Sequence, residues 1–558
     1  MNTNTQVPVL IVGAGPTGLT VANILARRGV AFRIVECDAG PIDQSRALWV
    51  HARTLEYWSR LGIIDAALTQ GRQTDRIGIL VHGQPTGVMP YRGDAISPFP
   101  YGLILEQSKT QRLLLASLAE YGGAVDWRTE LTVLSQDGAG VTAVLRRPDG
   151  REETVRADYL VGADGAGSAV REALGLSFEG DTFPQSFFLA DVEMDWELGH
   201  EQVYLSLAKA GAFAFLPMQG PRQFRLIGTT PPELNERTSL EPHEVEQLVN
   251  RQSGVQVTLR KTNWATVFRS HRRIAARFQV GRCFLVGDAA HIHTPAGGQG
   301  MNLGIGDAYN LGWKLAEVLV GAARPALLAS YEAERLPIAR AVIRRSDQLF
   351  DLEAGGSPLM QYVRQWVFPV ATMLMTRSTW AQRVAFTYLS QTWPAYPDSP
   401  AVMAAGKAGK TAGAGERAPF ARLAAGDTIY DRLTGLDHQL LVFGDTPAGL
   451  AELLRHYDVS VQVVALGENE AEARRSYGVV EPTLMLLRPD GHIGFRGPLT
   501  QLDAFAGYLD RHYMRRAERG SAQPQPERAQ ARRGELTAAS AHGPDPRFVS
   551  SATLIENV

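Results

Sequence analysis

The chain has 558 residues, 45% of them hydrophobic and 20% charged, which allows two to four domains in an ordinary globular enzyme. Its 56 basic and 58 acidic side chains create no net field for nucleic acid, and no apolar run is long enough to span a membrane. Two cysteines, Cys37 and Cys283, exclude a disulfide framework and a cysteine zinc site, and we expect both to be buried and reduced. The N-terminus lacks the features of a signal peptide, so the expected location is cytoplasmic.

The first 36 residues predict a βαβ unit that binds a dinucleotide. A buried strand at 7–12 leads into Gly13-Ala14-Gly15-Pro16-Thr17-Gly18, which opens a helix, and a second strand at 32–36 ends in Glu36. The glycines permit a tight turn and a close approach of backbone to pyrophosphate, and the helix N-terminus attracts phosphate. Glu36 can accept hydrogen bonds from ribose hydroxyls. The alternative is a purely structural glycine turn, and this motif alone does not separate NAD from FAD.

The middle of the chain changes from mixed structure to strands and then to helix. Residues 131–134 and 141–146 predict a hairpin that turns at Asp137-Gly138. Residues 178–268 contain short, aromatic and partly alternating segments, which predict a strand-rich region. A long helical section follows Asn302.

Two later segments each end a buried strand in glycine and aspartate. One contains Asp164-Gly165 and the other contains Gly287-Asp288. Such strand ends place carboxylates and free amides at the carboxyl edge of a sheet, where ligands bind. The second lies roughly 270 residues beyond the glycine turn, so a single ligand that touches both must be extended, as FAD is. For both aspartates the alternative is a helix N-cap.

At these three motifs the chain resembles the class A FAD-dependent aromatic hydroxylases, the flavoprotein monooxygenases typified by para-hydroxybenzoate hydroxylase, over about residues 7–350. The resemblance implies an α/β fold, in which a Rossmann-like FAD-binding domain carries an inserted β-rich substrate domain. It implies an enzyme that hydroxylates a small phenolic or polyketide-type aromatic substrate with NAD(P)H and O₂. In that family NAD(P)H reduces the flavin, O₂ adds at C4a, and the hydroperoxide transfers a hydroxyl group. No second glycine fingerprint for NAD(P)H is present, in agreement with the family.

The resemblance also assigns roles to individual residues. Asp288 would bind the ribityl or pyrophosphate region, and backbone of residues 300–302 would contact the pyrimidine side. Pro295, near the reactive edge of the ring, and Arg46, in a loop that helps the flavin move, are the candidate catalytic residues. The complete set of expected FAD contacts is Gly13, Ala14, Gly15, Pro16, Thr17, Gly18, Glu36, Ser45, Arg46, Gln107, Arg112, Asp164, Asp288, Pro295, Gly300, Met301 and Asn302.

Several of these assignments have ordinary alternatives. For Arg46 and Arg112 the alternative is a surface ion pair. The pair His291 and His293 lacks a third ligand at a fixed spacing, so no metal site is predicted. The substrate needs a dry, apolar cavity, and its expected walls, for which ordinary sheet core is the alternative, are Phe213, Phe215, Met218, Trp264 and Phe268.

Other chemistry on the same scaffold stays open. Baeyer–Villiger insertion or epoxidation is the main alternative to hydroxylation. A non-enzymatic flavin-binding protein is disfavoured, and an NAD-dependent dehydrogenase is disfavoured by the two later motifs. The tryptophan-rich signature of flavin-dependent halogenases is not found.

The C-terminal part resembles the thioredoxin-like domain of phenol and polyketide hydroxylases. Pro482 stands at the position of the cis-proline of that fold, but CxxC is absent, because Asp445-Thr-Pro-Ala follows the first strand. Disulfide exchange is therefore excluded, and a packing or homodimer role is expected. The predicted domains are an FAD-binding domain (1–177 and 275–350), a substrate domain (178–274, with 73–102 adding to its layer), a helical segment and linker (351–408), a thioredoxin-like domain (409–515) and a disordered tail (516–558).

Overall fold

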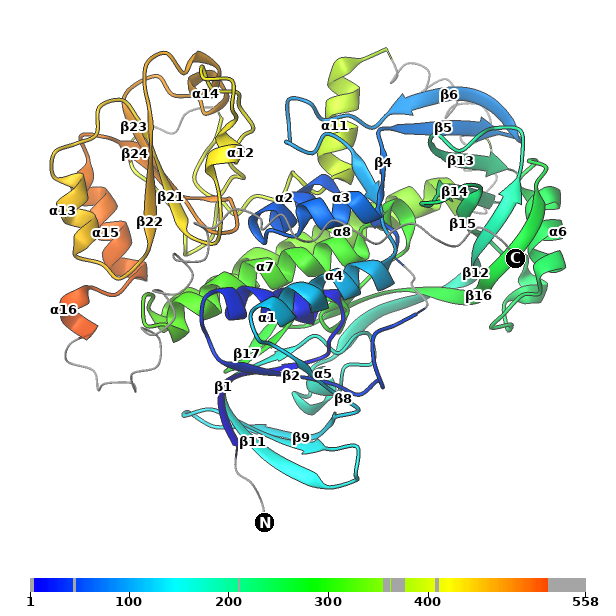
Figure 1. Ribbon diagram of the computed structural model, residues 1–558, viewed down its shortest axis with the longest axis horizontal. Helices are drawn as coiled ribbons and strands as arrows, with labels where there is room; N and C mark the ends of the chain where they lie inside the picture. The colour runs from blue at the N-terminus through cyan, green and yellow to red at the C-terminus, as the bar shows by residue number, and fades with distance from the viewer. Residues whose placement is uncertain are drawn as a thin grey trace, which may run out of the picture. The chain divides into compact units, whose positions relative to one another are not determined.

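Four β-sheets organise the computed structural model of the chain (Figure 1). The structure describes residues 5–43, 47–208, 211–354, 362, 377–406 and 411–519. Residues up to Arg516 belong to one compact unit. In the described ranges, no helix combines the length and the apolar character that crossing a membrane requires.

The first large sheet carries the parallel strands of the dinucleotide fold. Its strands are β1 Thr5–Val12, β2 Phe32–Glu36, β8 Val125–Trp127, β9 Glu130–Gln136, β10 Val141–Arg146, β11 Glu152–Gly162, β17 Gln279–Val280 and β18 Cys283–Leu285. Along the order β17–β18–β11–β1–β2–β8, the strands from β18 to β8 pair in parallel. Consequently the glycine turn after β1, Glu36 after β2 and the two aspartate motifs after β11 and β18 reach the same sheet edge.

Helices pack on this sheet and connect its strands. They are α1 Pro16–Arg27, α4 Gln107–Glu120, α5 Ala169–Ala173, α7 Gly300–Leu319 and α8 Ser330–Ala354, with the short helices η2 Gly287–Ala289, η3 Ala296–Gly298 and η4 Pro325–Ala329. In Figure 1, α1, α4 and α7 lie together on one side of the sheet. Because α1 contacts both α4 and α7, the glycine turn that opens α1 is held against two later parts of the chain.

The second large sheet lies beside this domain and has two differently covered faces. Its strands are β5 Arg76–Val81, β6 Gln84–Pro90, β12 Phe178–Asp195, β13 Val203–Ala208, β14 Gly211–Pro217, β15 Gln223–Thr229, β16 Thr258–Ala275 and β19 His291–Ile292. They run in the order β19–β16–β12–β15–β14–β13–β5–β6. Helix α6 (Pro242–Gln252) shares one apolar cluster with this sheet. A second apolar cluster contains Tyr91, Met218 and Phe386 and packs against Trp49.

A small sheet and three helices link the two large sheets. The elements are β3 Trp49–Val50, β4 Arg72–Thr74, β7 Gly102–Ile104, α2 Ala52–Arg60, α3 Ile64–Gln70 and α11 Thr379–Leu389, with η1 Pro232–Leu234 in the second large sheet's connections. Strand β3 pairs with β7, which also pairs with β4. Through β3 and α2, the segment that follows residues 44–46 reaches the start of α7.

The C-terminal region forms a separate sheet with one apolar cluster of its own and a second that includes Trp313 of α7. Its elements are β20 Met403–Ala404, β21 His438–Phe443, β22 Val461–Leu466, β23 Thr483–Leu487, β24 Ile493–Pro498, α12 Ile429–Arg432, α13 Leu450–Arg455, α14 Ala471–Ser476, α15 Leu502–His512 and α16 Arg516–Arg519. The order is β20–β24–β23–β21–β22, with β21 parallel to β22 and antiparallel to β23.

The structure departs from the sequence expectations at four places. Residues 403–404, expected in a linker, pair with β24, and the alanines at 412 and 418 are buried, because small side chains pack as readily as they link. Cys37 is exposed, since it lies just beyond the buried part of β2. No peptide bond in the described ranges is cis, so Pro482 is trans. Residues 516–519 are helical, and the rest of the expected tail lies outside the described residues.

Candidate active site

The glycine turn after β1 contains two glycines that the protein itself requires and one that it does not. Gly13 has φ +104°, and a Cβ there would lie 2.3 Å from the Ala163 carbonyl oxygen, while a Cβ on Gly18 would lie 2.0 Å from the Gly13 carbonyl oxygen. A Cβ on Gly15 would meet no heavy atom within 4 Å. Gly15 is the N-cap of α1 and has no side-chain cap. The space before the helix N-terminus is therefore open, as a phosphate group requires.

Glu36 closes the turn from the neighbouring strand. Its Oε2 accepts a hydrogen bond from the Ala14 amide at 2.8 Å, and its Oε1 accepts one from the Asp38 amide at 3.2 Å. The side chain thus fixes the turn while it stands at the sheet edge. A carboxylate at this position can also accept hydrogen bonds from ribose hydroxyls.

In the first aspartate motif, the Asp164 carboxylate accepts hydrogen bonds from its own turn. Asp164 Oδ1 accepts from the Ser168 hydroxyl at 2.6 Å, and Oδ2 accepts from the Val170 amide at 3.1 Å, at the start of α5. Burial raises the pKa of Asp164. Its neighbour Ala163 is the residue against which Gly13 packs, so this motif supports the glycine turn directly.

The second aspartate motif meets the glycine turn at Thr17. A Cβ on Gly287 would lie 2.8 Å from Thr17 Oγ1, and a Cβ on Gly304 of α7 would lie 2.7 Å from the same atom. Asp288 stands next to Gly287 and is exposed on this edge. The close approach joins the two motifs that the sequence separates most widely, and one extended ligand can reach both.

The loop that leads into α7 is held by side chains from β3 and α7. Asn302 Nδ2 donates to the Trp49 carbonyl at 2.8 Å and to the Gly298 carbonyl at 3.0 Å. Its Oδ1 accepts from the His51 amide at 2.8 Å. Pro295 begins this loop as the N-cap of η3. The side chain of Asn302 is thus engaged with the protein, and only backbone of residues 300–302 is available for a ligand.

Three buried polar atoms around this loop have no partner. They are His293 Nε2, Gln299 Oε1 and Trp49 Nε1. A Cβ on Gly300 would lie 3.7 Å from His293 Nε2. Burial lowers the pKa of His293 to about 4, so the ring is neutral. Each of these atoms can form a hydrogen bond with a polar aromatic ring system such as isoalloxazine, although the described residues contain other unpartnered buried atoms elsewhere.

Helix α4 contributes a residue that the sequence interpretation missed. Gln111 Nε2 donates to the Ala14 carbonyl at 2.8 Å, and its Oε1 accepts from the Ile42 amide at 2.9 Å. Gln111 is buried and bridges the glycine turn to the chain before residue 44. Nothing in its local sequence distinguishes it from the expected Gln107, which lies one turn earlier.

The expected contacts on α4 divide between the site and the surface. Gln107 Oε1 accepts a hydrogen bond from the Ala47 amide at 3.1 Å. Gln107 therefore holds the end of the arginine loop (residues 45–47). Arg112 forms a 2.8 Å ion pair with Asp43, and both side chains are more than half exposed. Ser45 and Arg46 lie outside the described residues.

A buried ion pair on the second large sheet faces the same loop. Arg225 binds Asp191 through two hydrogen bonds of 2.6 and 2.7 Å and donates to the Ala47 carbonyl at 3.3 Å. Trp264 Nε1 donates to Asp191 at 2.9 Å. Trp264, expected in the cavity wall, is therefore tied to this ion pair.

The other expected wall residues lie on different faces. Phe213 and Phe215 belong to the core shared with α6, so they are ordinary sheet core. Met218 packs in the cluster of Tyr91, next to the loop before α7. Phe268 stacks on Phe187 at 6.0 Å between ring centroids. Alternation of side chains along each strand separates these positions, and the sequence alone did not reveal which face is which.

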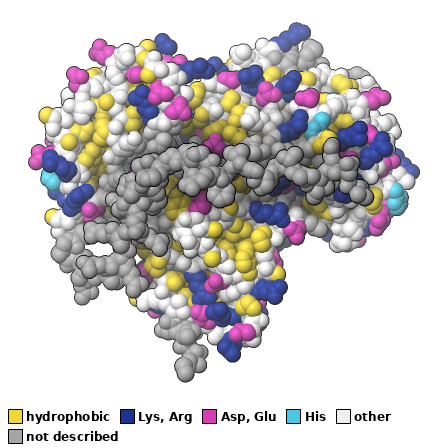
Figure 2. Space-filling view, viewed as in Figure 1, with side chains coloured by type: hydrophobic (Ala, Val, Ile, Leu, Met, Phe, Trp, Pro, Cys, Tyr) yellow, Lys and Arg dark blue, Asp and Glu magenta, His cyan; other side chains and the backbone are white. Residues whose placement is uncertain are grey.

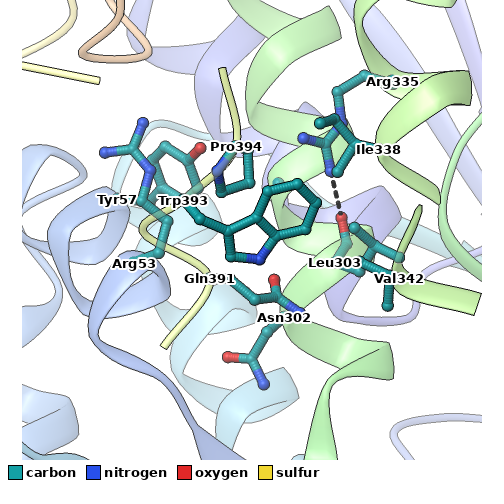
Figure 3. Close-up of a pocket in the computed structure, with 11 residues that line it drawn as sticks. Arg53, Tyr57, Asn302, Leu303, Arg335, Ile338, Val342, Gln391, Trp393 and Pro394 are labelled. Atoms are coloured by element: carbon teal, nitrogen blue, oxygen red, sulfur yellow. Dashed lines mark hydrogen bonds between the residues drawn. The ribbon is translucent and has the colours of Figure 1, made fainter. Parts of the chain in front are cut away.

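A pocket lies between α2, α7 and α8 and is drawn in Figure 3. The side chain of Trp393 lies across it, and Arg335 donates to the Leu303 carbonyl at 3.2 Å. The pocket is lined by Arg53, Tyr57, Asn302, Leu303, Gly306, Arg335, Ile338, Val342, Gln391, Trp393 and Pro394. It borders the first turn of α7 and contains none of the aspartate motifs.

The two histidines of the second aspartate motif have partners within the protein. His291 Nε2 lies 2.6 Å from Asp307 Oδ2, and Arg335 donates to Asp307 Oδ1 at 2.6 Å. In the described ranges, the one group of three residues whose possible ligand atoms come together is Glu36, Cys37 and Asp38, whose Glu36 is engaged with the glycine turn.

The fold and this site define a mixed α/β protein with a glycine turn of the kind that binds dinucleotides. Residues 6–346 match the FAD binding domain family, and residues 411–514 match the family of aromatic-ring hydroxylase C-terminal domains. The chain belongs to the FAD-dependent aromatic-ring hydroxylases and is a monooxygenase with FAD as its cofactor and NAD(P)H as its co-substrate.

Two curated relatives and one solved structure show the extent of the likeness. The 6-methylpretetramide 4-monooxygenase of Streptomyces rimosus is 34% identical over 509 residues, which cover 88% of this chain and 90% of the relative. The pentachlorophenol 4-monooxygenase of Sphingobium chlorophenolicum is 30% identical over 538 residues, 91% of this chain and 97% of the relative. The structure of aklavinone-11 hydroxylase with FAD and aklavinone has a TM-score of 0.74 at 27% identity and covers 92% of this chain and 99% of that one.

Proposed function

We propose that FAD lies extended along the edge of the first large sheet, from the glycine turn to the loop before α7. The observation that carries this placement is Gly15, whose missing side chain meets no protein atom although it caps a helix in a tight turn. A glycine that the fold does not need leaves room for a ligand. The pyrophosphate would accept hydrogen bonds from the backbone amides of Gly15, Thr17 and Gly18, and Glu36 would accept hydrogen bonds from the ribose hydroxyls.

The second half of the cofactor would occupy the edge between η2 and α7. Asp288 would bind the ribityl region, and the backbone of Gly300, Met301 and Asn302 would contact the pyrimidine side. The side chain of Asn302 would not do so, because four hydrogen bonds already engage it. Asp164 would act through the turn that it caps, and Arg112 would contribute at most through Asp43.

We infer that the substrate is a phenolic or polyketide-type aromatic compound bound between Pro295 and the second large sheet. Support comes from the relatives named for pentachlorophenol and for 6-methylpretetramide. The apolar cluster of Tyr91, Met218 and Phe386 borders Trp49 and would form a dry wall. Bound FAD, reduced by NAD(P)H, supplies the activation of O₂. The residues of the chain hold the two rings together and exclude water.

Pro295 and Arg46 are proposed as the residues closest to the chemistry. Pro295 starts the η3 turn at the point where the loop would pass the reactive edge. Arg46 precedes Ala47, which Gln107 and Arg225 both contact. The arginine loop is thus anchored at its end by two elements, a suitable arrangement for a segment that positions the flavin.

The division into domains is also proposed. The FAD-binding domain would comprise 1–177 and 275–350, and the substrate domain 178–274 with β5 and β6. The C-terminal sheet, with β21 parallel to β22 and antiparallel to β23, supports a thioredoxin-like domain without redox cysteines. The turn at residues 488–492 contacts α2 and α8, which supports a packing role. A homodimer role is the alternative.

A direct test uses the purified protein and a panel of phenols and polycyclic phenols. We expect a yellow protein whose NAD(P)H oxidation and O₂ uptake rise with an accepted substrate, and a product that gains one oxygen atom. Because Baeyer–Villiger insertion adds the same mass, the product structure must show a new phenolic hydroxyl rather than a lactone. A colourless protein that takes up no added FAD would overturn the proposal.

A further inference from the structure

His51 is a buried ring between the substrate side and the loop before α7. It stands between β3 and α2, and 1% of its surface is exposed. Its Nε2 lies 3.0 Å from the Gly297 carbonyl oxygen, and its Nδ1 lies 3.1 Å from the Tyr91 hydroxyl. Both ring nitrogens are therefore engaged, one by the loop and one by the apolar cluster.

The partners fix where the proton of the ring resides. A carbonyl oxygen only accepts, so Nε2 must carry hydrogen and donate to Gly297. Burial lowers the pKa of His51 to about 4, so the ring is neutral and Nδ1 accepts from the Tyr91 hydroxyl. A proton that entered this chain at Tyr91 would stop at an amide carbonyl, which passes none on. A relay of protons is therefore excluded, and the arrangement is one that holds a position.

The loop that His51 contacts is unusually free without such contacts. Gly297 and Gly298 both have positive φ, 72° and 62°, and consecutive glycines have many accessible conformations. Here His51 holds the first carbonyl, and Asn302 holds the second at 3.0 Å. Asn302 also accepts from the His51 amide at 2.8 Å. These two side chains select one loop conformation and tie it to β3, the continuation of the arginine loop.

We propose that His51 is a positioning residue for the flavin, because its Nε2–H fixes the Gly297 carbonyl and with it the path of residues 295–298. This inference rests on the proposed function, in which the same loop borders the isoalloxazine ring. His51 does not touch the reacting atoms. It acts through Gly297, whose carbonyl oxygen accepts the hydrogen of Nε2.

Two substitutions separate the loop contact from the Tyr91 contact. In His51→Gln the amide nitrogen reaches the place of Nε2, whereas in His51→Asn it reaches only that of Nδ1. We expect His51→Gln to bind FAD within about threefold of the unchanged protein and His51→Asn to bind it about tenfold more weakly. Tyr91→Phe keeps the Gly297 contact and is the matched control, with FAD affinity within about threefold.

The readouts are the FAD dissociation constant from flavin fluorescence and hydrogen exchange of the peptide that covers residues 295–302 in the apoprotein. We expect faster exchange there in His51→Asn only, with melting temperature and circular dichroism confirming that each variant folds. Equal FAD affinity and equal exchange in the Gln and Asn variants would overturn the inference. If the unchanged protein bound no FAD, the proposed function would fail, while exchange in the apoprotein would still test the contact.

If His51→Asn does not fold, a second measurement tests the role of His51 without that variant. Nitrogen-15 spectra of labelled histidine, with His51 assigned by its loss in His51→Gln, report which ring nitrogen carries hydrogen. We expect hydrogen on Nε2 and none on Nδ1. Hydrogen on Nδ1 would leave the Gly297 carbonyl without its donor and would overturn the inference.

Discussion

Two of the buried polar clusters that touch helix α7 are built from different kinds of groups. At its start, the loop node (His51, Asn302, Gly297 and Gly298) contains neutral donors and acceptors. Farther along, the junction cluster (Lys314, Glu334, Arg488 and Asp490) contains full charges, with Arg488 and Lys314 at 2.6 and 2.8 Å from Glu334 and all four side chains at most 1% exposed.

The difference separates a structural device from a site. Burial opposes the ionisation of Glu334, but Arg488 and Lys314 hold its pKa below the usual value. Such a cluster holds only when every charge keeps its partner, and it fixes the C-terminal turn against α7 and α8. The loop node contains no charged side chain. Neutral dipoles orient a loop beside a ligand without imposing a fixed charge on it, which suits a cofactor whose own charge changes during turnover.

On the face shown in Figure 2, basic and acidic side chains are interspersed, and the whole chain has 56 basic and 58 acidic residues. Buried ion pairs of the described residues include the junction cluster, the Arg225–Asp191 pair, the Arg335–Asp307 pair and the pairing of Glu56 with Arg53 and Arg417. Surface pairs such as Arg112–Asp43 are exposed and contribute little.

The largest effect is expected at the junction cluster. Arg488→Met leaves two buried carboxylates without their main partner, so the free energy of unfolding in urea should fall by about 3–5 kcal/mol. Arg515→Met is the matched control, because Arg515 pairs with Asp510 on the surface, and it should unfold as the unchanged protein does. A stable Arg488→Met protein would show that the C-terminal turn is not held by this cluster.

Acid should destabilise the protein through its buried histidines, of which His51 belongs to the loop node and His492 contacts Asp490 of the junction cluster. Burial lowers the pKa of His51 and of His293 from 6.5 to about 4, so the unfolded chain binds more protons below pH 6.5. Stability should therefore fall as pH drops from 6.5 to 4, by about 2 kcal/mol per histidine at pH 5. Unfolding in urea at pH 7.5 and pH 5 measures this. Between pH 7.5 and pH 5, the free energy of unfolding of His51→Gln should fall by about 2 kcal/mol less than that of the unchanged protein. Equal decreases in the two proteins would show that the pKa of His51 is not lowered.

A smaller effect is expected at the second aspartate motif. Asp288→Ala should weaken FAD binding about tenfold, the equivalent of about 1.4 kcal/mol, because a carboxylate at the sheet edge loses its contacts with the ribityl chain. Its melting temperature without FAD should stay unchanged, since the side chain is exposed. Asp149→Ala, in an exposed turn, is the control. If the Asp288→Ala protein still bound FAD fully, Asp288 would not be part of the ribityl site.

Much of this site could be predicted because its motifs are local in sequence. The first strand, glycine turn and helix follow from apolar pattern and spacing, and the strands predicted at 32–36 and 141–146 are β2 and β10. The motifs at Asp164 and Asp288 could be ordered relative to the first because parallel strands share one edge. The family match then extends to residue 346.

The missed residues are those whose roles depend on distant partners. Gln111 contacts Ala14 across 97 positions, and His51 contacts Gly297 across 246. Neither residue has a spacing or a sequence neighbour that would predict its role. Likewise, Phe213 lies in β14 and Met218 directly follows the same strand, and only the packing of α6 on one face of the sheet places them in different apolar clusters.

The most direct test of the account is the behaviour of Gly15→Ala. A methyl group at this position meets no protein atom within 4 Å, and φ there is −67°, so the apoprotein should melt at the same temperature as the unchanged protein. The same methyl group should obstruct the pyrophosphate and weaken FAD binding at least tenfold. Undiminished FAD binding by a stable Gly15→Ala protein would contradict the placement of the cofactor along this sheet edge.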